Sequence, residues 1–270
     1  MNKIKQIIKN IAPLIVVELF KKPTRYGFFG DYIDWKDAVN NSSGYDSPVI
    51  FDKVKNSAMK VKQGLAASER DGVAFDTKQS SWPVVAMLLL SSSLNDNHLN
   101  VLDFGGSLGS SYFQNIEFIK HLKELHWAIV EQNNIYEYGK QNFEDGKLSF
   151  YKSLEDALNK TKPQVILFGS SIQYIEKPYE LLEKVARNDF EMIAFDRTPF
   201  FNGKEALTVQ KVPPRIYDAS YPAWILDIDK FKEFFKKNGY DIVAEFEQGK
   251  MPYNGKEGLI VLKHLTFKKK

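Results

Sequence analysis

The chain has 270 residues, of which 43% are hydrophobic and 26% charged, proportions typical of a globular protein rather than a disordered one. It has no cysteine, which excludes disulfide scaffolds, cysteine nucleophiles, thiolate zinc sites and cysteine-bound iron–sulfur clusters. The net charge is only +3 and no basic stripe is present, so we expect no nucleic-acid partner. No apolar run reaches the ~18 residues of a membrane span, and we expect a cytoplasmic protein.

Residues 1–80 are predicted to form a helical extension or cap. Apolar residues recur at helical spacing over residues 4–15 and again from Phe51 to Leu65. The basic amphipathic segment 1–25 has two interpretations. It packs on its own domain or a partner subunit, or it lies peripherally on the inner face of a membrane or on a partner protein. Arg70-Asp71-Gly72 is typical of a turn.

Residues 81–270 are predicted to form an α/β domain, because short apolar strands alternate with helices and indicate a mostly parallel sheet. Ser81 is expected to cap a buried helix that carries Pro83 in its first turn. The proline-rich segment 198–224 is expected to be a long lid loop, and an antiparallel hairpin is expected near the end of the chain. The expected strands are Leu99–Phe104, Trp127–Val130, Leu148–Tyr151, Val165–Phe168, Met192–Phe195, Asp241–Phe246 and Leu259–Leu262, and the expected helices are Trp82–Ser92, Ser110–Leu125, Tyr179–Arg187 and Asp229–Lys237.

A glycine-rich turn joins the first of these strands to the next helix. Glycines let the backbone approach a ligand closely, and the helix N-terminus offers free N–H groups. The dinucleotide fingerprint requires a glycine where Phe104 stands, and phenylalanine does not readily take that tight turn. Asp103, Gly105 and Gly109 instead fit the methyltransferase pattern of an acidic residue followed by glycines, with Ser107 replacing the middle glycine.

An acidic residue, Glu131, follows the next strand and can accept hydrogen bonds from both ribose hydroxyls of a nucleoside. Its spacing from the glycine turn suits either S-adenosylmethionine or NAD. The terminal hairpin favours S-adenosylmethionine, because methyltransferase sheets typically end in this way. The alternatives are an NAD-dependent oxidoreductase or epimerase, a non-catalytic protein of this fold that docks a glycosyltransferase or a membrane, and a glycine turn without a ligand.

Seven short motifs carry a resemblance to a known family. They are Ser43-Gly44-Tyr45-Asp46, Arg70-Asp71, Leu102-Asp103-Phe104-Gly105-Gly106-Ser107-Leu108-Gly109, Val130-Glu131-Gln132, Ser170-Ser171-Ile172-Gln173-Tyr174, Asp196-Arg197-Thr198-Pro199-Phe200 and Ala219-Ser220-Tyr221-Pro222-Ala223-Trp224. From about Trp35 onward the chain resembles class I methyltransferases that are often encoded among bacterial surface-polysaccharide genes. The resemblance implies a seven-stranded Rossmann-like α/β fold and S-adenosylmethionine as cofactor. We expect O-methylation of a sugar or another small polar acceptor in surface-polysaccharide biosynthesis.

The candidate site residues follow the carboxyl ends of the predicted strands, where open α/β sheets bind ligands. Those expected to bind the cofactor are Asp103, Phe104, Gly105, Gly106, Ser107, Gly109, Glu131, Gln132, Ser170 and Ser171, and those expected to bind the acceptor are Gln173, Tyr174, Arg215, Tyr221 and Trp224. Asp196 and Arg197 are the candidate catalytic residues, as general base and anion clamp. The alternative is that Asp196 caps a turn while Arg197 forms a structural ion pair. The four histidines lack paired ligand spacing, so no metal is expected.

Overall fold

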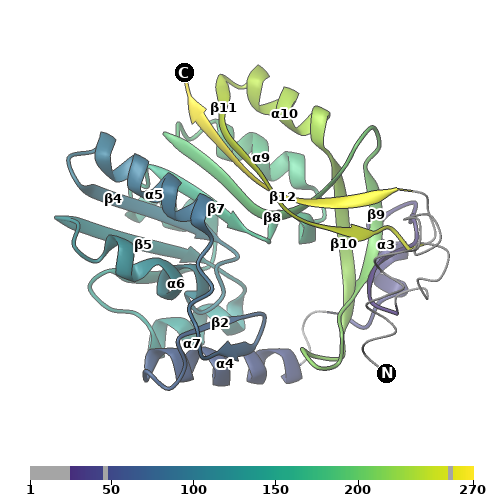
Figure 1. Ribbon diagram of the computed structural model, residues 1–270, viewed down its shortest axis with the longest axis horizontal. Coiled ribbons are helices and arrows are strands. Elements are labelled where there is room, and N and C mark those ends of the chain that lie inside the picture. Colours follow the sequence, from purple (N-terminus) through teal and green to yellow (C-terminus); the bar gives the residue numbers. More distant parts are fainter. Residues whose placement is uncertain (1–24, 45–47, 255–257) are drawn as a thin grey trace, which may run out of the picture.

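The computed structural model describes residues 25–44, 48–254 and 258–270, and Figure 1 shows their arrangement. The amphipathic helix predicted near the start of the chain lies outside the described residues. Its association with a membrane or a partner stays a prediction. In the part of the chain that is described, no helix has the length and apolar character needed to cross a bilayer.

Seven strands form the sheet that the sequence predicts, and only β12 runs opposite to the others, which confirms the terminal hairpin. In spatial order they are β6 (Leu148–Tyr151), β5 (Glu124–Val130), β4 (His98–Phe104), β7 (Val165–Gly169), β8 (Met192–Phe201), β12 (Leu259–Lys269) and β11 (Tyr240–Pro252). The central strand β7 is buried along nearly its whole length because its residues are apolar and helices cover both faces of the sheet.

Three further strands, which the sequence did not predict, extend this seven-stranded sheet to ten. They are β10 (Ser220–Asp227), β9 (Ala206–Lys211) and β1 (Gly27–Phe29). At the C-terminal end of β8, β10 pairs with it in parallel. Strand β9 then pairs with β10, and β1 pairs with β9, both antiparallel. The expected loop over 198–224 is therefore mostly strand. Pro199 is tolerated in β8 because the neighbouring strand β7 pairs with β8 only as far as Asp196.

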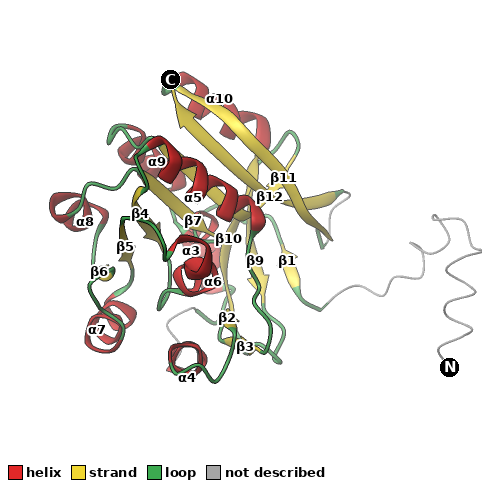
Figure 2. Ribbon diagram, turned by 60° about the vertical axis from the view of Figure 1, so that its left-hand side comes forward, coloured by secondary structure: helices red, strands yellow, loops and turns green. Residues whose placement is uncertain are grey.

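Helices cover both faces of the sheet (Figure 2). Those that pack into the core of one face are α4 (Pro48–Lys62), α5 (Trp82–Leu94), α6 (Ser110–Ile119) and α7 (Asn133–Asn142). Those that pack into the core of the other face are α8 (Leu154–Lys160), α9 (Pro178–Ala186) and α10 (Ile228–Lys237). The short helix α3 (Trp35–Asn40) contacts β9 and β10, and the single turn η1 (Ile172–Tyr174) follows β7.

The residues before α5 include more than helices. A small hairpin of β2 (Ser68–Arg70) and β3 (Val73–Phe75) contacts α4, as Figure 2 also shows. The predicted turn is confirmed, because both of its central residues have positive φ, 53° at Asp71 and 72° at Gly72. The hairpin carries this turn towards the carboxyl ends of the central strands.

Three expectations for the helices are wrong. The side chain of Ser81 does not cap α5, and that helix is not fully buried, since Trp82 is 66% exposed. The hydroxyl of Ser81 instead donates to the carboxylate of Asp196 over 2.8 Å. The helix predicted over Ser110–Leu125 ends at Ile119 as α6, and Leu125 belongs to β5, where it pairs with Leu99 of β4.

Candidate active site

The glycine turn between β4 and α6 has room for backbone only. Gly105 has a φ of 71°, and a Cβ there would lie 2.6 Å from the Cβ of Ser171. A Cβ on Gly106 would lie 2.5 Å from Cγ of Asp103. Both contacts are shorter than atoms tolerate, so glycine is required at the two positions and the bare backbone is available to a ligand.

The parallel pairing of β4 with β5 brings Glu131 to the same edge of the sheet, because Phe104 is in register with Val130. One carboxylate oxygen of Glu131 accepts the Ser107 N–H at 2.9 Å, and the other accepts the Gln132 N–H at 2.9 Å. Burial raises the pKa of Glu131, against the lowering effect of these two N–H groups. The side chain is thus fixed beside the glycine turn with its carboxylate held by backbone donors.

Asp103 lies beneath the turn rather than beside a ligand. Its side chain is fully buried, and Oδ2 accepts a hydrogen bond of 3.3 Å from the indole N–H of Trp127. Burial raises the pKa of Asp103 to about 7. It fills the space that a side chain at Gly106 would need and so supports the turn, and Gly109, with a φ of 96°, is the N-cap residue of α6.

A first cavity of about 520 Å³ opens at this edge. All of the predicted cofactor residues except Asp103 and Gly109 line it: Phe104, Gly105, Gly106, Ser107, Glu131, Gln132, Ser170 and Ser171. Two tyrosines of the β9–β10 region, Tyr217 and Tyr221, complete its wall together with Trp35 of α3. The structure therefore gathers residues of six strands, β2, β4, β5, β7, β8 and β10, around one space together with Trp35 of α3.

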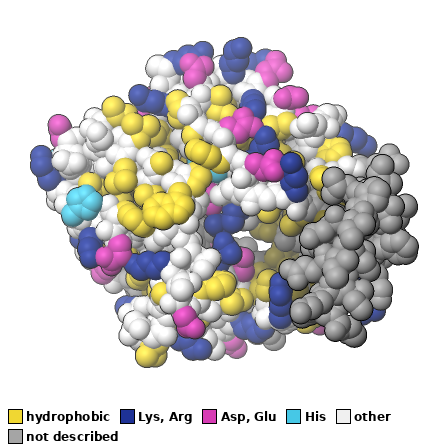
Figure 3. Space-filling model, viewed as in Figure 1, with side chains coloured by type: hydrophobic (Ala, Val, Ile, Leu, Met, Phe, Trp, Pro, Cys, Tyr) yellow, Lys and Arg dark blue, Asp and Glu magenta, His cyan; other side chains and the backbone are white. Residues whose placement is uncertain are grey.

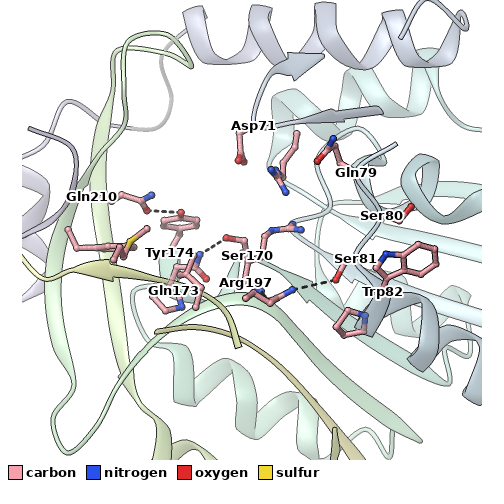
Figure 4. A pocket seen from close by; sticks show the side chains of 17 residues that line it. Asp71, Gln79, Ser80, Ser81, Trp82, Ser170, Gln173, Tyr174, Arg197 and Gln210 are labelled. Carbon is pink, nitrogen blue, oxygen red and sulfur yellow. Dashed lines mark hydrogen bonds between the residues drawn. The ribbon is translucent and has the colours of Figure 1, made fainter. Parts of the chain in front are cut away.

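A second cavity of about 560 Å³ adjoins the first, and this face of the molecule is hollowed near its centre in Figure 3. Five residues line both cavities: Arg70, Asp71, Ser170, Tyr174 and Arg197. Figure 4 shows Asp71, Ser170, Tyr174 and Arg197 around one open space. A reaction between two ligands, one in each cavity, would take place among these shared residues.

Left-handed backbone conformations cluster at this junction. Among the described residues, seven other than glycine have a positive φ, and four of them line the two cavities: Asp71, Ser107, Ser170 and Arg197, with φ between 53° and 66°. Such conformations cost energy and persist where the surrounding structure holds them, which is common at binding and catalytic sites. The other three, Asp96, Asn97 and Asp189, line neither cavity, so the four at the junction agree with this region as the candidate site.

Of the predicted acceptor residues, the structure brings together three. Gln173 and Tyr174 line the second cavity, and Tyr174 and Tyr221 line the first. Arg215 and Trp224 line neither cavity. Arg215 is exposed, and the indole N–H of Trp224 donates to the carbonyl oxygen of Glu176 over 3.2 Å.

Asp196 is only 2% exposed and lines neither cavity, so its contacts favour a structural role over that of a base. Its Oδ1 lies within 3.0 Å of Ser81 Oγ, Gln248 Nε2 and His264 Nδ1. Its Oδ2 pairs with Arg197 Nη1 at 2.9 Å. Burial alone would raise the pKa of Asp196, but the hydrogen bond to His264 and the charge of Arg197 hold that pKa at about 2.

No family profile matches this sequence, and no curated protein shows a significant match to it. Solved structures do match. The N-terminal domain of EvdMO1 with SAH (S-adenosylhomocysteine) bound has a TM-score of 0.50 and 10% identity, over 80% of this chain and 97% of that one. This protein has a Rossmann-like methyltransferase fold.

Two other similar structures are magnesium protoporphyrin IX methyltransferase from Synechocystis PCC 6803 with bound SAM and a 1,6-didemethyltoxoflavin-N1-methyltransferase from Burkholderia thailandensis. The first has a TM-score of 0.44 and 11% identity, over 84% of this chain and 87% of that one. The second has a TM-score of 0.44 and 13% identity, over 88% and 97%.

Beyond the methyltransferase fold, the structure reveals site residues that the sequence did not single out. Arg70 and Asp71 were recognised only as a turn and as part of a resemblance. They reach the cavities because β2 lies against α6, which begins at the glycine turn. Among the described residues, no three histidine, aspartate or glutamate side chains gather as metal ligands.

Glu69 lines neither cavity but is a buried carboxyl group beside α6, with 3% exposure. Its carboxyl group accepts a hydrogen bond from Ser110 and lies 3.4 Å from the Ser57 hydroxyl, which also donates to the Val54 carbonyl oxygen over 3.0 Å. The Ser57 hydroxyl has a single hydrogen, which it donates to Val54. Its oxygen can therefore accept a hydrogen bond from a protonated Glu69 carboxyl group. Burial raises the pKa of Glu69 from 4.5 to about 7.

We expect Glu69→Gln to stabilise the protein at about pH 8 and to have little effect at about pH 5. A pKa raised on folding means that the unfolded chain releases this proton first, so wild-type stability falls as pH rises from 4.5 towards 7. The gain in free energy of unfolding should reach about 2–3 kcal/mol. Urea denaturation measures it, with exposed Glu180→Gln as control. Equal effects at both pH values would contradict the raised pKa.

Proposed function

We propose that the protein is an S-adenosylmethionine-dependent methyltransferase acting on a hydroxyl of a sugar or another small polar acceptor. The observation that carries this proposal is the glycine turn of Gly105 and Gly106 facing one cavity together with Glu131, in a methyltransferase fold. The sequence resemblance supports the same cofactor. A role in surface-polysaccharide biosynthesis rests on that resemblance alone.

The residues of the first cavity fit this cofactor. The carboxylate of Glu131 stands at the end of β5, where it would accept hydrogen bonds from the two ribose hydroxyls. Gly105 and Gly106 line the same cavity without a side chain, so their backbone would be open to contact with the rest of the nucleoside. The positively charged side chain of Lys152 also lines this cavity, together with the carboxylate of Glu131.

When bound, S-adenosylmethionine supplies an electrophilic methyl group on its sulfonium sulfur. The protein must then align the acceptor hydroxyl with that methyl group and accept the hydroxyl proton. Asp71 is the candidate base, because its carboxylate lines both cavities and, within the described residues, forms no ion pair. Tyr174 also lines both cavities, but burial raises its pKa. Its phenol therefore stays neutral and donates its hydrogen to Gln210 Oε1 over 2.7 Å.

We expect calorimetry to show S-adenosylmethionine or SAH binding at about 1 µM, which corresponds to roughly −8 kcal/mol. Gly105→Val should abolish detectable binding, because the side chain would collide with Ser171 and occupy the turn. Glu131→Ala should weaken binding strongly by removing the ribose contact. Gly146→Val is the matched control, since a Cβ at Gly146 meets no atom within 4 Å.

Circular dichroism and the melting temperature would show that each variant is folded before its binding is compared. If folded wild-type protein binds neither S-adenosylmethionine nor SAH, the proposed function is wrong. Binding of NAD in their place would favour the oxidoreductase alternative.

A further inference from the structure

We propose that the second cavity takes an acceptor that carries an anionic group, a phosphate or a carboxylate, bound between the guanidinium groups of Arg70 and Arg197. This inference rests on the proposed function, because it names the class of acceptor for the same site. The hydroxyl to be methylated would lie near Asp71, and the anionic group would lie at the two arginines. The cavity would thus select a bifunctional small molecule.

Arg197 is positioned in advance for such contact. Its backbone, at a φ of 53°, is held by a 2.8 Å hydrogen bond from its N–H to Gln248 Oε1. Asp196 pairs with Nη1 at 2.9 Å from the buried side. A guanidinium has five N–H donors, so one edge fixes its orientation and others remain for a ligand. Its side chain keeps 23% exposure and lines both cavities.

Arg70 approaches from the opposite element, the β2–β3 hairpin, and also lines both cavities. Its guanidinium carbon lies 5.9 Å from the centre of the Phe75 ring, which restricts its orientation without consuming its hydrogen-bond donors. Among the residues that the structure describes, no carboxylate pairs with it. An arginine near a cavity without an anionic partner is suited to a phosphate or carboxylate of a ligand.

The remaining wall of the second cavity agrees with a polar, sugar-like acceptor. Its ionisable side chains, apart from tyrosine, are Arg70, Arg197 and Asp71, and Asp196 pairs with Arg197 from behind this wall. The neutral polar residues that line it are Gln79, Ser80, Ser81, Ser170, Gln173, Gln210 and Gln248. Amides and hydroxyls of this kind both donate and accept hydrogen bonds, as the hydroxyls of a sugar require. Charge and hydrogen-bonding capacity therefore point to the same class.

The test uses the whole protein saturated with SAH and titrated calorimetrically with inorganic phosphate or, separately, with acetate, at ionic strength held constant by chloride. We expect at least one anion to bind wild-type protein. Arg70→Gln and Arg197→Gln should each weaken that binding about tenfold or more, because each removes charge-assisted hydrogen bonds. The stronger of the two anions identifies phosphate or carboxylate as the recognised group.

Arg187→Gln is the matched control, since Arg187 directly follows α9, its side chain is 77% exposed and it lines neither cavity, so anion affinity should be unchanged. Arg70→Gln keeps the test decisive if Arg197→Gln, which unpairs Asp196, fails to fold. The inference is overturned if phosphate and acetate bind wild-type protein no better than the folded Arg70→Gln variant. Failure of SAH to bind contradicts the proposed function instead, and the anion titration on unliganded protein still tests the arginines.

Discussion

Replacing Asp196 by asparagine is expected to lower the free energy of unfolding at pH 7 by about 3–5 kcal/mol, the usual cost of breaking a buried ion pair. Asparagine has nearly the same shape, so the loss comes from the missing charge. Arg197 would lose its 2.9 Å partner, and the buried His264 would lose the carboxylate 3.0 Å from its Nδ1. The side-chain NH2 group of the asparagine would also point at neighbours that donate hydrogen bonds, such as Gln248 Nε2, and could not accept from them.

The same change should flatten the acid limb of the stability curve. The pKa of Asp196 is lowered from 3.8 to about 2 in the folded protein, so its stabilisation is present above about pH 4 and is lost as pH falls towards 2. Urea denaturation between pH 2.5 and pH 7 would measure both effects. Asp156→Asn is the control, because Asp156 forms a surface pair of 3.4 Å with Lys160.

The opposite result would restore the catalytic interpretation of Asp196. If Asp196→Asn unfolds within about 1 kcal/mol of wild type while methyl transfer collapses, the carboxylate acts on the acceptor and not on the network around it. Measuring SAH affinity on the same variant separates this outcome from damage to the first cavity, since Asp196 does not line that cavity.

Sequence patterns predicted the central sheet and the cofactor turn because their signals are local. The apolar runs of β4, β5 and β7 and the glycines after β4 need no distant partner to be recognised. The strands β9 and β10 were missed for the opposite reason. Pro199 and Pro222 are typical of a loop, and the pairing that makes this segment a sheet includes residues about 180 positions earlier in β1.

The candidate site shows the same division. The cofactor residues sit directly after strands, so their position in the sheet edge follows from the chain itself. The role of Asp196 depends instead on residues distant in sequence. His264 of β12 and Gln248 of β11 occupy its carboxylate with hydrogen bonds, so the carboxylate is not free to act as a base. Asp71 was not predicted as a base because a turn near residue 70 carries no signal of where its hairpin packs.

Asp71→Asn is expected to reduce methyl transfer about 10²- to 10⁴-fold, the contribution typical of a positioned base where proton removal matters. The substitution keeps the size of the side chain and removes only its capacity to accept the proton. The carboxylate is exposed in a surface turn, so the melting temperature should hardly change. SAH affinity should also be retained, and the loss should fall on kcat rather than on KM.

The measurement is transfer of labelled methyl from S-adenosylmethionine to an acceptor that supports turnover by the wild-type protein. Asp76→Asn is a close control, because Asp76 is exposed just after the same hairpin and lines neither cavity. Undiminished transfer by Asp71→Asn would show that no base is needed at this position, as for an acceptor that reacts already deprotonated. A loss of SAH binding equal to the loss of rate would instead make Asp71 part of the cofactor site. Since Asp71 stands where the two cavities join, a loss confined to kcat would place the transferred proton, and with it the acceptor hydroxyl, at that junction.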